Sequence, residues 1–178
     1  TLNFQIVGKP DAECFQGEIE QGAHIVAYNH DFAEKVDDVV SVVIPKGALY
    51  ESIAMKMERK EMEIKADSTL HVLSPAYSIH HDDTPLQTSI GVVFSMPIEP
   101  ALQPYAAMAS VSANGNLSYV GGSYRNLRFT ARTSNFGTFC LVADCTAPII
   151  RPQFTDGEDC RSRNSISFRL SDNFSGVA

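Results

Sequence analysis

The chain has 178 residues, of which 44% are hydrophobic and 20% charged, and its formal net charge is -7. This composition is typical of a folded globular protein and unlike that of disordered or fibrous chains. Phosphate neutralisation requires clustered lysine and arginine, so the acidic balance disfavours a nucleic-acid partner. No stretch approaches the roughly 20 apolar residues that span a bilayer, and no signal peptide opens the chain. The chain stops at Ala178 within a strand-like stretch, and we therefore expect it to be part of a longer protein.

Short apolar runs separated by Pro, Gly, Asn and Ser recur at the spacing of all-β domains. A turn at Pro45, Lys46 and Gly47 ends the first of these runs, and Asn114-Gly115 is the strongest hairpin signal in the chain. The predicted strands are residues 39–44, 69–73, 90–94, 105–111, 117–120, 127–131 and 139–143. The pattern predicts an all-β fold, an antiparallel β-sandwich of the immunoglobulin-like type.

Residues 51–66 are ambiguous, because they are rich in Glu, Lys, Met and Ala, which form helices well. A helical interpretation places Ile53 and Met57 four residues apart on one face. A strand interpretation gives two apolar faces in succession, first Ile53, Met55 and Met57 and then Met62 and Ile64. The alternation fits the first half more closely and the neighbouring runs are strands, so we favour a β-hairpin with its turn at Arg59-Lys60.

Shifts in composition divide the chain into three parts. Residues 1–37 are predicted to be a leader or the end of a preceding domain that pairs onto the sandwich. Residues 38–146 are predicted to form the main β-sandwich. Residues 147–178, with a strand-like run at 166–170, are predicted to begin a second small immunoglobulin-like module.

The four cysteines are Cys14, Cys140, Cys145 and Cys160, and none belongs to a C-x-x-C pair. A zinc ribbon or a thioredoxin-like redox site therefore has no support. Cys140 lies in an apolar run and is predicted to be a small buried hydrophobe. If a disulfide forms, Cys145 and Cys160 are the expected pair, and closing that loop would stabilise the fold by roughly 3 kcal/mol. Whether they pair is left open.

The densest cluster of metal-ligand side chains is His80-His81-Asp82-Asp83. Neighbouring residues of a strand point to opposite faces, so these four could share one ion only in a loop. The Pro at position 85 favours such a loop, which leaves two interpretations, a weak metal site and an exposed polar connection, of which we favour the second. The other histidines are isolated in the sequence and are expected to be exposed or structural: His24, His30 and His71.

Signals of nucleophilic or phosphate chemistry are lacking in the sequence. There is no G-x-S-x-G elbow, and burial would disfavour the thiolate of Cys140. Gly121-Gly122 precedes a strand-like run instead of a helix, and we interpret it as a turn and not a phosphate cradle. We therefore predict no catalytic, cofactor-binding or metal-binding residues and no cofactor in this chain.

Several short motifs, in their order along the chain, resemble a known family. The V-I-P-K-G-A-L-Y-E sequence of residues 43–51 resembles the I-P-x-G-A-L signature of a β-sandwich shared by ankyrins and netrin receptors. It is more similar to the non-catalytic C-terminal region of Bacteroidales lysostaphin-type (LytM-like) zinc metallopeptidases. There a G-x-(Y/F)-x-L-x-x-D strand and T-x-P follow, as at residues 137–144 and 146–148. Residues 171–177 resemble the D-N-x-S-G-(I/V) of the immunoglobulin-like module that comes next.

This resemblance implies architecture and not activity. The peptidase family binds zinc through H-x-x-x-D and H-x-H motifs, and neither occurs in this chain. We expect the chain to be a non-catalytic accessory region of an exported cell-wall metalloendopeptidase, whose catalytic domain would lie upstream. Its expected partner is peptidoglycan, another envelope component, or the catalytic domain of the parent chain. The expected location is the periplasm or cell surface, where disulfides are permitted.

Two other functions remain open. The first is a stand-alone carbohydrate- or protein-binding surface module, in which Tyr105, Tyr119 and Tyr124 stack on sugars instead of packing between strands. The second is a hydrolase with its site at residues 80–83. The sequence leaves the ligand and the oligomeric state open.

Overall fold

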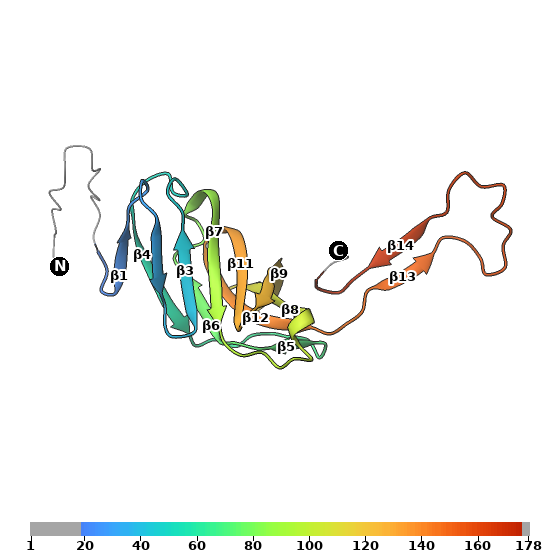
Figure 1. The fold of residues 1–178 in the computed structure, drawn as a ribbon, viewed down its shortest axis with the longest axis horizontal. Helices are drawn as coiled ribbons and strands as arrows, with labels where there is room; N and C mark the ends of the chain where they lie inside the picture. Colours follow the sequence, from blue (N-terminus) through green and yellow to red (C-terminus); the bar gives the residue numbers. More distant parts are fainter. Residues whose placement is uncertain (1–18, 176–178) are drawn as a thin grey trace.

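The structure, a computed structural model, describes residues 19–175 and consists of two antiparallel sheets packed as a sandwich (Figure 1). The first sheet contains β1 (Ala23–Val26), β4 (Ile53–Lys60), β5 (Leu70–Val72), β6 (Ala76–Ile79), β8 (Ala106–Val111), β9 (Leu117–Gly121) and β12 (Gly137–Asp144). The second sheet contains β2 (Phe32–Lys35), β3 (Val40–Ile44), β7 (Pro85–Ser95), β10 (Ser123–Arg125) and β11 (Arg128–Asn135). The predicted antiparallel β-sandwich is confirmed.

Strand order places β9 and β10 at neighbouring ends of the two sheets. The first sheet runs β1-β4-β6-β12-β8-β9, with β5 pairing to β12, and the second runs β10-β11-β7-β3-β2. A two-stranded sheet of β13 (Ile149–Pro152) and β14 (Phe168–Ser171) follows the sandwich. The described residues contain one short 3-10 helix, η1 (Gln103–Tyr105), and no α-helix. Within residues 19–175 no helix is long and apolar enough to cross a membrane.

Aromatic side chains from both sheets form the centre of the core. Tyr77 of β6 packs edge-on against Phe94 of β7, with ring centroids 6.0 Å apart, and Phe94 packs in the same manner against Phe129 at 6.5 Å. The buried hydroxyl of Tyr77 donates a 2.9 Å hydrogen bond to Asp37, in the turn between β2 and β3. Burial, with the neighbouring carboxylate of Asp37, raises the pKa of Tyr77 to about 12. This contact therefore ties the two sheets together with a neutral phenol and an ionised acid.

Most predicted strands are observed. β3, β5, β7, β11 and β12 overlap the predicted runs, and β7 and β11 extend beyond them. The Asn114-Gly115 hairpin is confirmed, since β8 and β9 pair across it, and Gly115 has a φ of +79°. Gly121 and Gly122, with φ of +97° and +130°, carry the chain from the first sheet to the second as the predicted turn.

The predicted hairpin within residues 51–66 is wrong in its second half. Ile53, Met55 and Met57 face the core from one strand, β4, as the alternation predicted. However, β4 continues through Arg59 and Lys60, which pair with β6, so no turn forms there. Residues 61–66, which we call the strap, belong to no strand.

The strap covers an apolar patch on the outer face of the first sheet. We call this patch the outer cluster; it consists of Ala107, Ala109, Val111, Cys140 and Val142. Met62 and Ile64 of the strap pack against it, and the amide of Lys65 donates a 2.8 Å hydrogen bond to the carbonyl of Gly115. β8 and β12 are apolar on both faces, so the outer face requires a cover. The strap lies over this face instead of continuing as the second strand of a hairpin.

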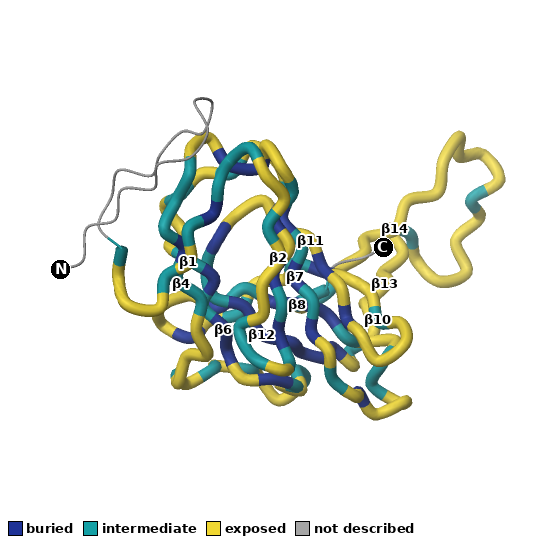
Figure 2. The backbone as a smooth tube through the Cα atoms, turned by 60° about the vertical axis from the view of Figure 1, so that its left-hand side comes forward, coloured by how far each residue is buried: buried dark blue, intermediate teal, exposed yellow. Residues whose placement is uncertain are grey.

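The segment that follows β14 returns to the sandwich. Phe174 packs against the outer cluster and contacts Tyr119 edge-on, with centroids 5.8 Å apart. The amide of Ser175 donates a 3.2 Å hydrogen bond to Asp144 at the end of β12, and Asn173 donates to Thr69 at 2.9 Å. The β13–β14 hairpin itself extends away from the sandwich and is exposed (Figures 1 and 2).

The structure bears on only part of the predicted division of the chain into three segments. β1 and β2, which lie within residues 1–37, pair with β4 and β3 in the two sheets. Residues 1–18 lie outside the described residues, and the boundaries at 37 and 146 stay predictions.

A glycine pair tests the packing of the strap. Gly47 and Gly115 both have φ near +78°, but a Cβ at Gly47 meets nothing, whereas one at Gly115 overlaps the backbone carbonyl of Glu63 in the strap. We expect Gly47→Ala to cost about 1 kcal/mol through backbone strain alone. Gly115→Ala should cost about 1–3 kcal/mol more, because the strap must shift. Urea denaturation of both variants measures the difference, and equal losses would contradict the packing described.

Candidate functional site: a cleft between the two sheets

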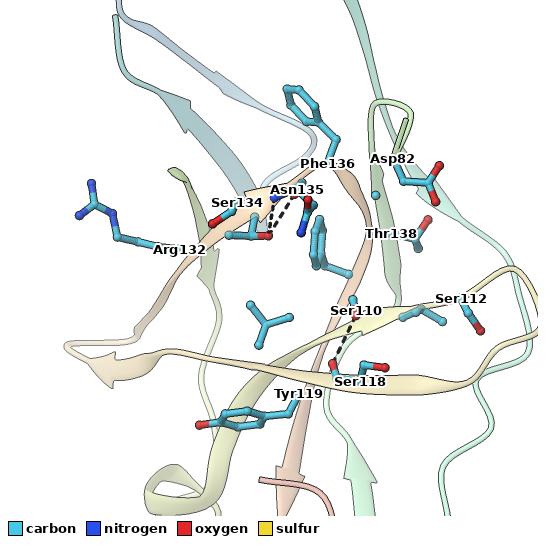
Figure 3. Close-up of a pocket in the computed structure, with 15 residues that line it drawn as sticks. Asp82, Ser110, Ser112, Ser118, Tyr119, Arg132, Ser134, Asn135, Phe136 and Thr138 are labelled. Carbon is cyan, nitrogen blue, oxygen red and sulfur yellow. Dashed lines mark hydrogen bonds between the residues drawn. The ribbon is translucent and has the colours of Figure 1, made fainter. Parts of the chain in front are cut away.

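A cleft of about 670 Å³ lies between the two sheets. One side is formed by β8, β9 and β12 and the other by the second half of β11 (Figure 3). Its lining residues are Asp82, Ser110, Val111, Ser112, Ser118, Tyr119, Val120, Arg132, Thr133, Ser134, Asn135, Phe136, Gly137, Thr138 and Phe139. The lining is rich in hydroxyl groups above an aromatic floor, which suits a ligand with both polar and apolar parts.

Strand geometry explains why the sheets separate here. β10 pairs only with Arg128–Thr130 of β11, so the rest of β11 has no partner on that side among the described residues. Between Thr133 and Asn135 the register of β11 with β7 shifts. The hydroxyl of Thr133 donates to the carbonyl of Asn135 at 3.0 Å and accepts from its amide at 3.2 Å (Figure 3). This bulge bends β11 and keeps the cleft open.

The charged and aromatic groups of the cleft lie on its rim. Arg132 and Asp82 are exposed and lie on opposite sides of the opening in Figure 3. Neither forms an ion pair with any residue in the described part of the chain. Tyr119 is 47% exposed, and its edge contact with Phe174 fixes its ring at the lower rim. The rim thus offers one cation, one anion and one aromatic face.

The His80–Asp83 cluster connects β6 to β7 beside the cleft. His81, Asp82 and Asp83 are exposed, as expected of a polar connection. Among residues 19–175 no group of three His, Cys, Asp or Glu side chains is placed to hold a metal ion. His80 is half-buried with a φ of +56°, and its ring packs edge-on against Phe136 with centroids 5.2 Å apart. His80 therefore acts as a packing residue behind the cleft.

The remaining predicted candidates separate into exposed and packed residues. His24, His30 and His71 are exposed. Tyr105 is 51% exposed but lies at the opposite end of β8 from the cleft. The hydroxyl of Tyr124 donates to the carbonyl of Met96 and accepts from the amide of Ile98, both at 3.2 Å, so this ring packs between strands. Of the three tyrosines, the structure brings only Tyr119 to the cleft.

The cysteines follow the sequence interpretation where they are described. Cys140 is fully buried, and burial raises the pKa of its thiol to about 12. Cys145 is exposed, Cys160 is half-buried, and both are free, so the disulfide left open above is not formed. Cys14 lies outside the described residues.

The sequence analysis did not find the cleft. Its hydroxyl residues come from β8, β9 and β11, and none of them forms a motif in sequence. One signal was present, since Ser110 and Ser118 lie opposite each other across the Asn114-Gly115 hairpin. Serines facing each other on a predicted hairpin mark a polar patch on a face that would otherwise be apolar.

A profile of the Zu5-like domain family matches residues 23–144. The chain belongs to the Zu5-like family. The match begins with the first residue of β1 and ends with the last of β12, so it covers both sheets and excludes β13 and β14. This is the sandwich of ankyrins and netrin receptors that residues 43–51 resemble, and it is generally a non-catalytic interaction module. A search of curated proteins found no significant match. The peptidase part of the resemblance stays a prediction.

The position of His80 predicts an acid sensitivity of the Zu5-like domain. Burial lowers the pKa of His80, and the nearby His81 lowers it further. The carboxylate of Asp83 opposes this shift only in part. Acid therefore protonates the unfolded chain first, and the free energy of unfolding should fall as the pH drops below about 6.5.

His80→Asn tests this, because Asn tolerates a positive φ and does not titrate. Between roughly pH 7 and pH 5, its unfolding free energy should fall less than that of the unsubstituted protein. Urea denaturation at several pH values measures this, with the exposed His71→Asn as control. A parallel pH dependence of the two proteins would contradict the assignment.

Cys140 should be inert in the folded Zu5-like domain. In a variant with Cys14, Cys145 and Cys160 replaced by Ser, we expect maleimide to label Cys140 at least about a thousandfold more slowly than in urea, because reaction requires unfolding. A variant that keeps only Cys145 should react at once. Rapid labelling of Cys140 in the folded protein would show that the strap does not protect it.

Proposed function

We propose that this Zu5-like chain is a non-catalytic interaction module of an exported protein, which binds a cell-wall or envelope component through the cleft. The observation that carries the proposal is the cleft itself, with its hydroxyl lining and the exposed ring of Tyr119 at its rim. Such a combination orients a ligand by hydrogen bonds and holds it by apolar contact. The module would work in the periplasm or at the cell surface.

The parent protein that we propose is a cell-wall metalloendopeptidase. Support comes from the order of three motifs, at residues 43–51, 137–144 and 171–177. Two of these motifs touch in the structure, because Ser175 donates its hydrogen bond to Asp144. In such a parent the module would position a catalytic domain on peptidoglycan, while the zinc-binding histidines would lie in that domain.

A stand-alone carbohydrate- or protein-binding module is the second candidate function. It is favoured by the same position of Tyr119, since an exposed aromatic ring beside hydroxyl groups is also suited to a sugar. The two candidates share the cleft and differ in whether a peptidase is attached.

Co-sedimentation with purified peptidoglycan sacculi tests the proposed function. We expect the full chain to sediment with sacculi and to release no fragments from them in the presence of zinc. Tyr119→Ala should weaken binding at least about tenfold, because the ring is the one large exposed anchor of the cleft. Tyr105→Ala, which removes a tyrosine of similar exposure away from the cleft, should bind normally.

Two results would count against the proposal. A chain that stays in the supernatant at saturating sacculi would show that peptidoglycan is not the partner. Equal losses in the two tyrosine variants would show that binding does not use the cleft.

A further inference from the structure

The hairpin that joins β10 to β11 has an apolar tip with a strained backbone. Arg125 pairs with Arg128, so only Asn126 and Leu127 form the turn, and both have a positive φ, of 51° and 61°. Two-residue turns of this kind prefer Asn-Gly, because both positions must adopt a left-handed conformation. Asn tolerates that conformation, but a bulky side chain such as that of Leu127 is strained in it. The fold alone would therefore favour glycine at this position.

Burial does not offset the strain at Leu127. This residue is 63% exposed, as much as Tyr50 and more than any other large hydrophobic residue in the described part of the chain. It packs against neither of the two hydrophobic clusters. By contrast, His80, which also has a positive φ, packs its ring against Phe136. Strained residues concentrate at functional sites, so Leu127 points to a contact outside this chain.

Two arginines flank the apolar tip. Arg125 and Arg128 lie directly opposite each other across the hairpin, and like charges in this arrangement destabilise a sheet. Tyr124 and Phe129, the next pair along the strands, pack toward the core, so alternation directs both arginines to the outer face of the second sheet. Neither arginine forms an ion pair with any residue between positions 19 and 175. The tip thus presents a leucine beside two cations that no acid of the described chain neutralises.

The sheet face behind the tip carries no acidic side chain. On β11, Thr130 and Arg132 follow Arg128 at alternate positions, and Figure 3 shows Arg132 extending away from the other labelled residues of the cleft. The outward positions opposite these residues on β7, and next to them on β3, are Ser95, Val93, Gly91, Ser41 and Val43. The chain as a whole has a net charge of -7, so this basic face differs from the rest of the surface.

An apolar tip between cations fits an anionic lipid surface. The guanidinium group of arginine binds phosphate oxygens through two parallel hydrogen bonds. Leu127 lies one residue beyond the arginine pair, about 3 Å along the strand, so it would reach below the phosphates that the arginines bind. Apolar burial and attraction to anionic lipids act together in such contacts. An acidic polypeptide would also satisfy the arginines, but it would not account for a strained leucine where the turn favours glycine.

We propose that the β10–β11 tip binds the surface of an anionic phospholipid bilayer, with Leu127 inserted below the headgroups and Arg125 and Arg128 on their phosphates. This contact goes beyond the proposed function, since none of these three residues lines the cleft. It would hold the module against a membrane while the cleft binds its own ligand. One leucine and two arginines give a weak and reversible attachment.

Flotation of the full chain with lipid vesicles tests the proposal. One set of vesicles contains phosphatidylglycerol and phosphatidylethanolamine in roughly equal parts, and a neutral set contains phosphatidylcholine alone. We expect the chain to float with the anionic vesicles at high lipid concentration and not with the neutral ones. Arg125→Gln and Arg128→Gln should each lower the partition coefficient about fivefold, because each removes one charge from the membrane surface. Arg151→Gln, which removes an exposed arginine of β13, is the matched control and should float normally.

Leu127→Gly separates membrane binding from a structural role. Relief of backbone strain should lower the equilibrium constant of unfolding at least about twofold, as measured by urea denaturation. The same substitution should weaken binding to anionic vesicles about tenfold, because the apolar anchor is lost. Tyr50→Ala is the control, since Tyr50 is equally exposed but follows Leu49, which pairs with Leu86 at the other end of β7 from the tip. A variant that is more stable and binds more weakly supports the proposal.

Other outcomes overturn it. If the unsubstituted chain does not float, or if the tip variants float as it does, the tip is not a membrane contact. If the arginine variants lose binding but Leu127→Gly does not, the face binds anions without insertion, as it would bind an acidic polypeptide. If free glycerol phosphate displaces the chain from the vesicles, the site holds a small phosphate and not a bilayer. An unchanged stability of Leu127→Gly would contradict the strain from which the proposal is argued.

The cleft is tested separately from the tip. Tyr119→Ala should float with anionic vesicles as the unsubstituted chain does, and Leu127→Gly should sediment normally with sacculi. Failure of vesicle binding therefore leaves the proposed function standing, and failure of sacculus binding leaves the membrane contact standing.

Discussion

β12 is buried on both faces, and the rest of the structure is arranged to satisfy this constraint. Its last six residues, Phe139–Asp144, are all buried. Phe139 and Leu141 face the core between the sheets, whereas Cys140 and Val142 face outward into the outer cluster. A strand in an antiparallel sandwich ordinarily exposes one face to solvent. Because β12 does not, the chain must supply a second cover outside the sandwich, and it supplies the strap and Phe174.

That second cover also links the end of the chain to the Zu5-like domain. Asp144 accepts hydrogen bonds from the amides of Thr146, where the chain leaves β12, and of Ser175, where it returns after the β13–β14 hairpin. Phe174, next to Ser175, contributes to the cover of the outer cluster and holds Tyr119 at the rim of the cleft. The burial of β12 therefore affects the candidate site. Phe174, which helps to cover the outer cluster, also orients Tyr119, the exposed aromatic ring of the cleft.

The sequence predicted the strands well because their side chains alternate, and its errors have the same origin. Met62 and Ile64 do alternate and are both partly buried, but they cover the outer face of the sheet without belonging to a strand. The strap's backbone meets the sheet at Lys65, which forms an isolated parallel bridge with Asn116. Alternation of apolar residues indicates which side chains are buried, but it does not indicate which segment pairs with the backbone. The cleft could not be predicted from the sequence for a related reason. Ser118 and Thr133 line the same cleft only because the chain crosses from one sheet to the other, and composition does not indicate this crossing.

The open side of the sandwich follows from how little of β11 is covered by β10. A longer β10 would pair along β11 to Asn135 and close the cleft, but it would have to begin before Ser123. The residues before Ser123 form β9, which pairs with β8 in the first sheet, and Gly121 and Gly122, both with positive φ, carry the chain across to β10. The opening of the cleft is therefore set by the point at which the chain crosses from the first sheet to the second.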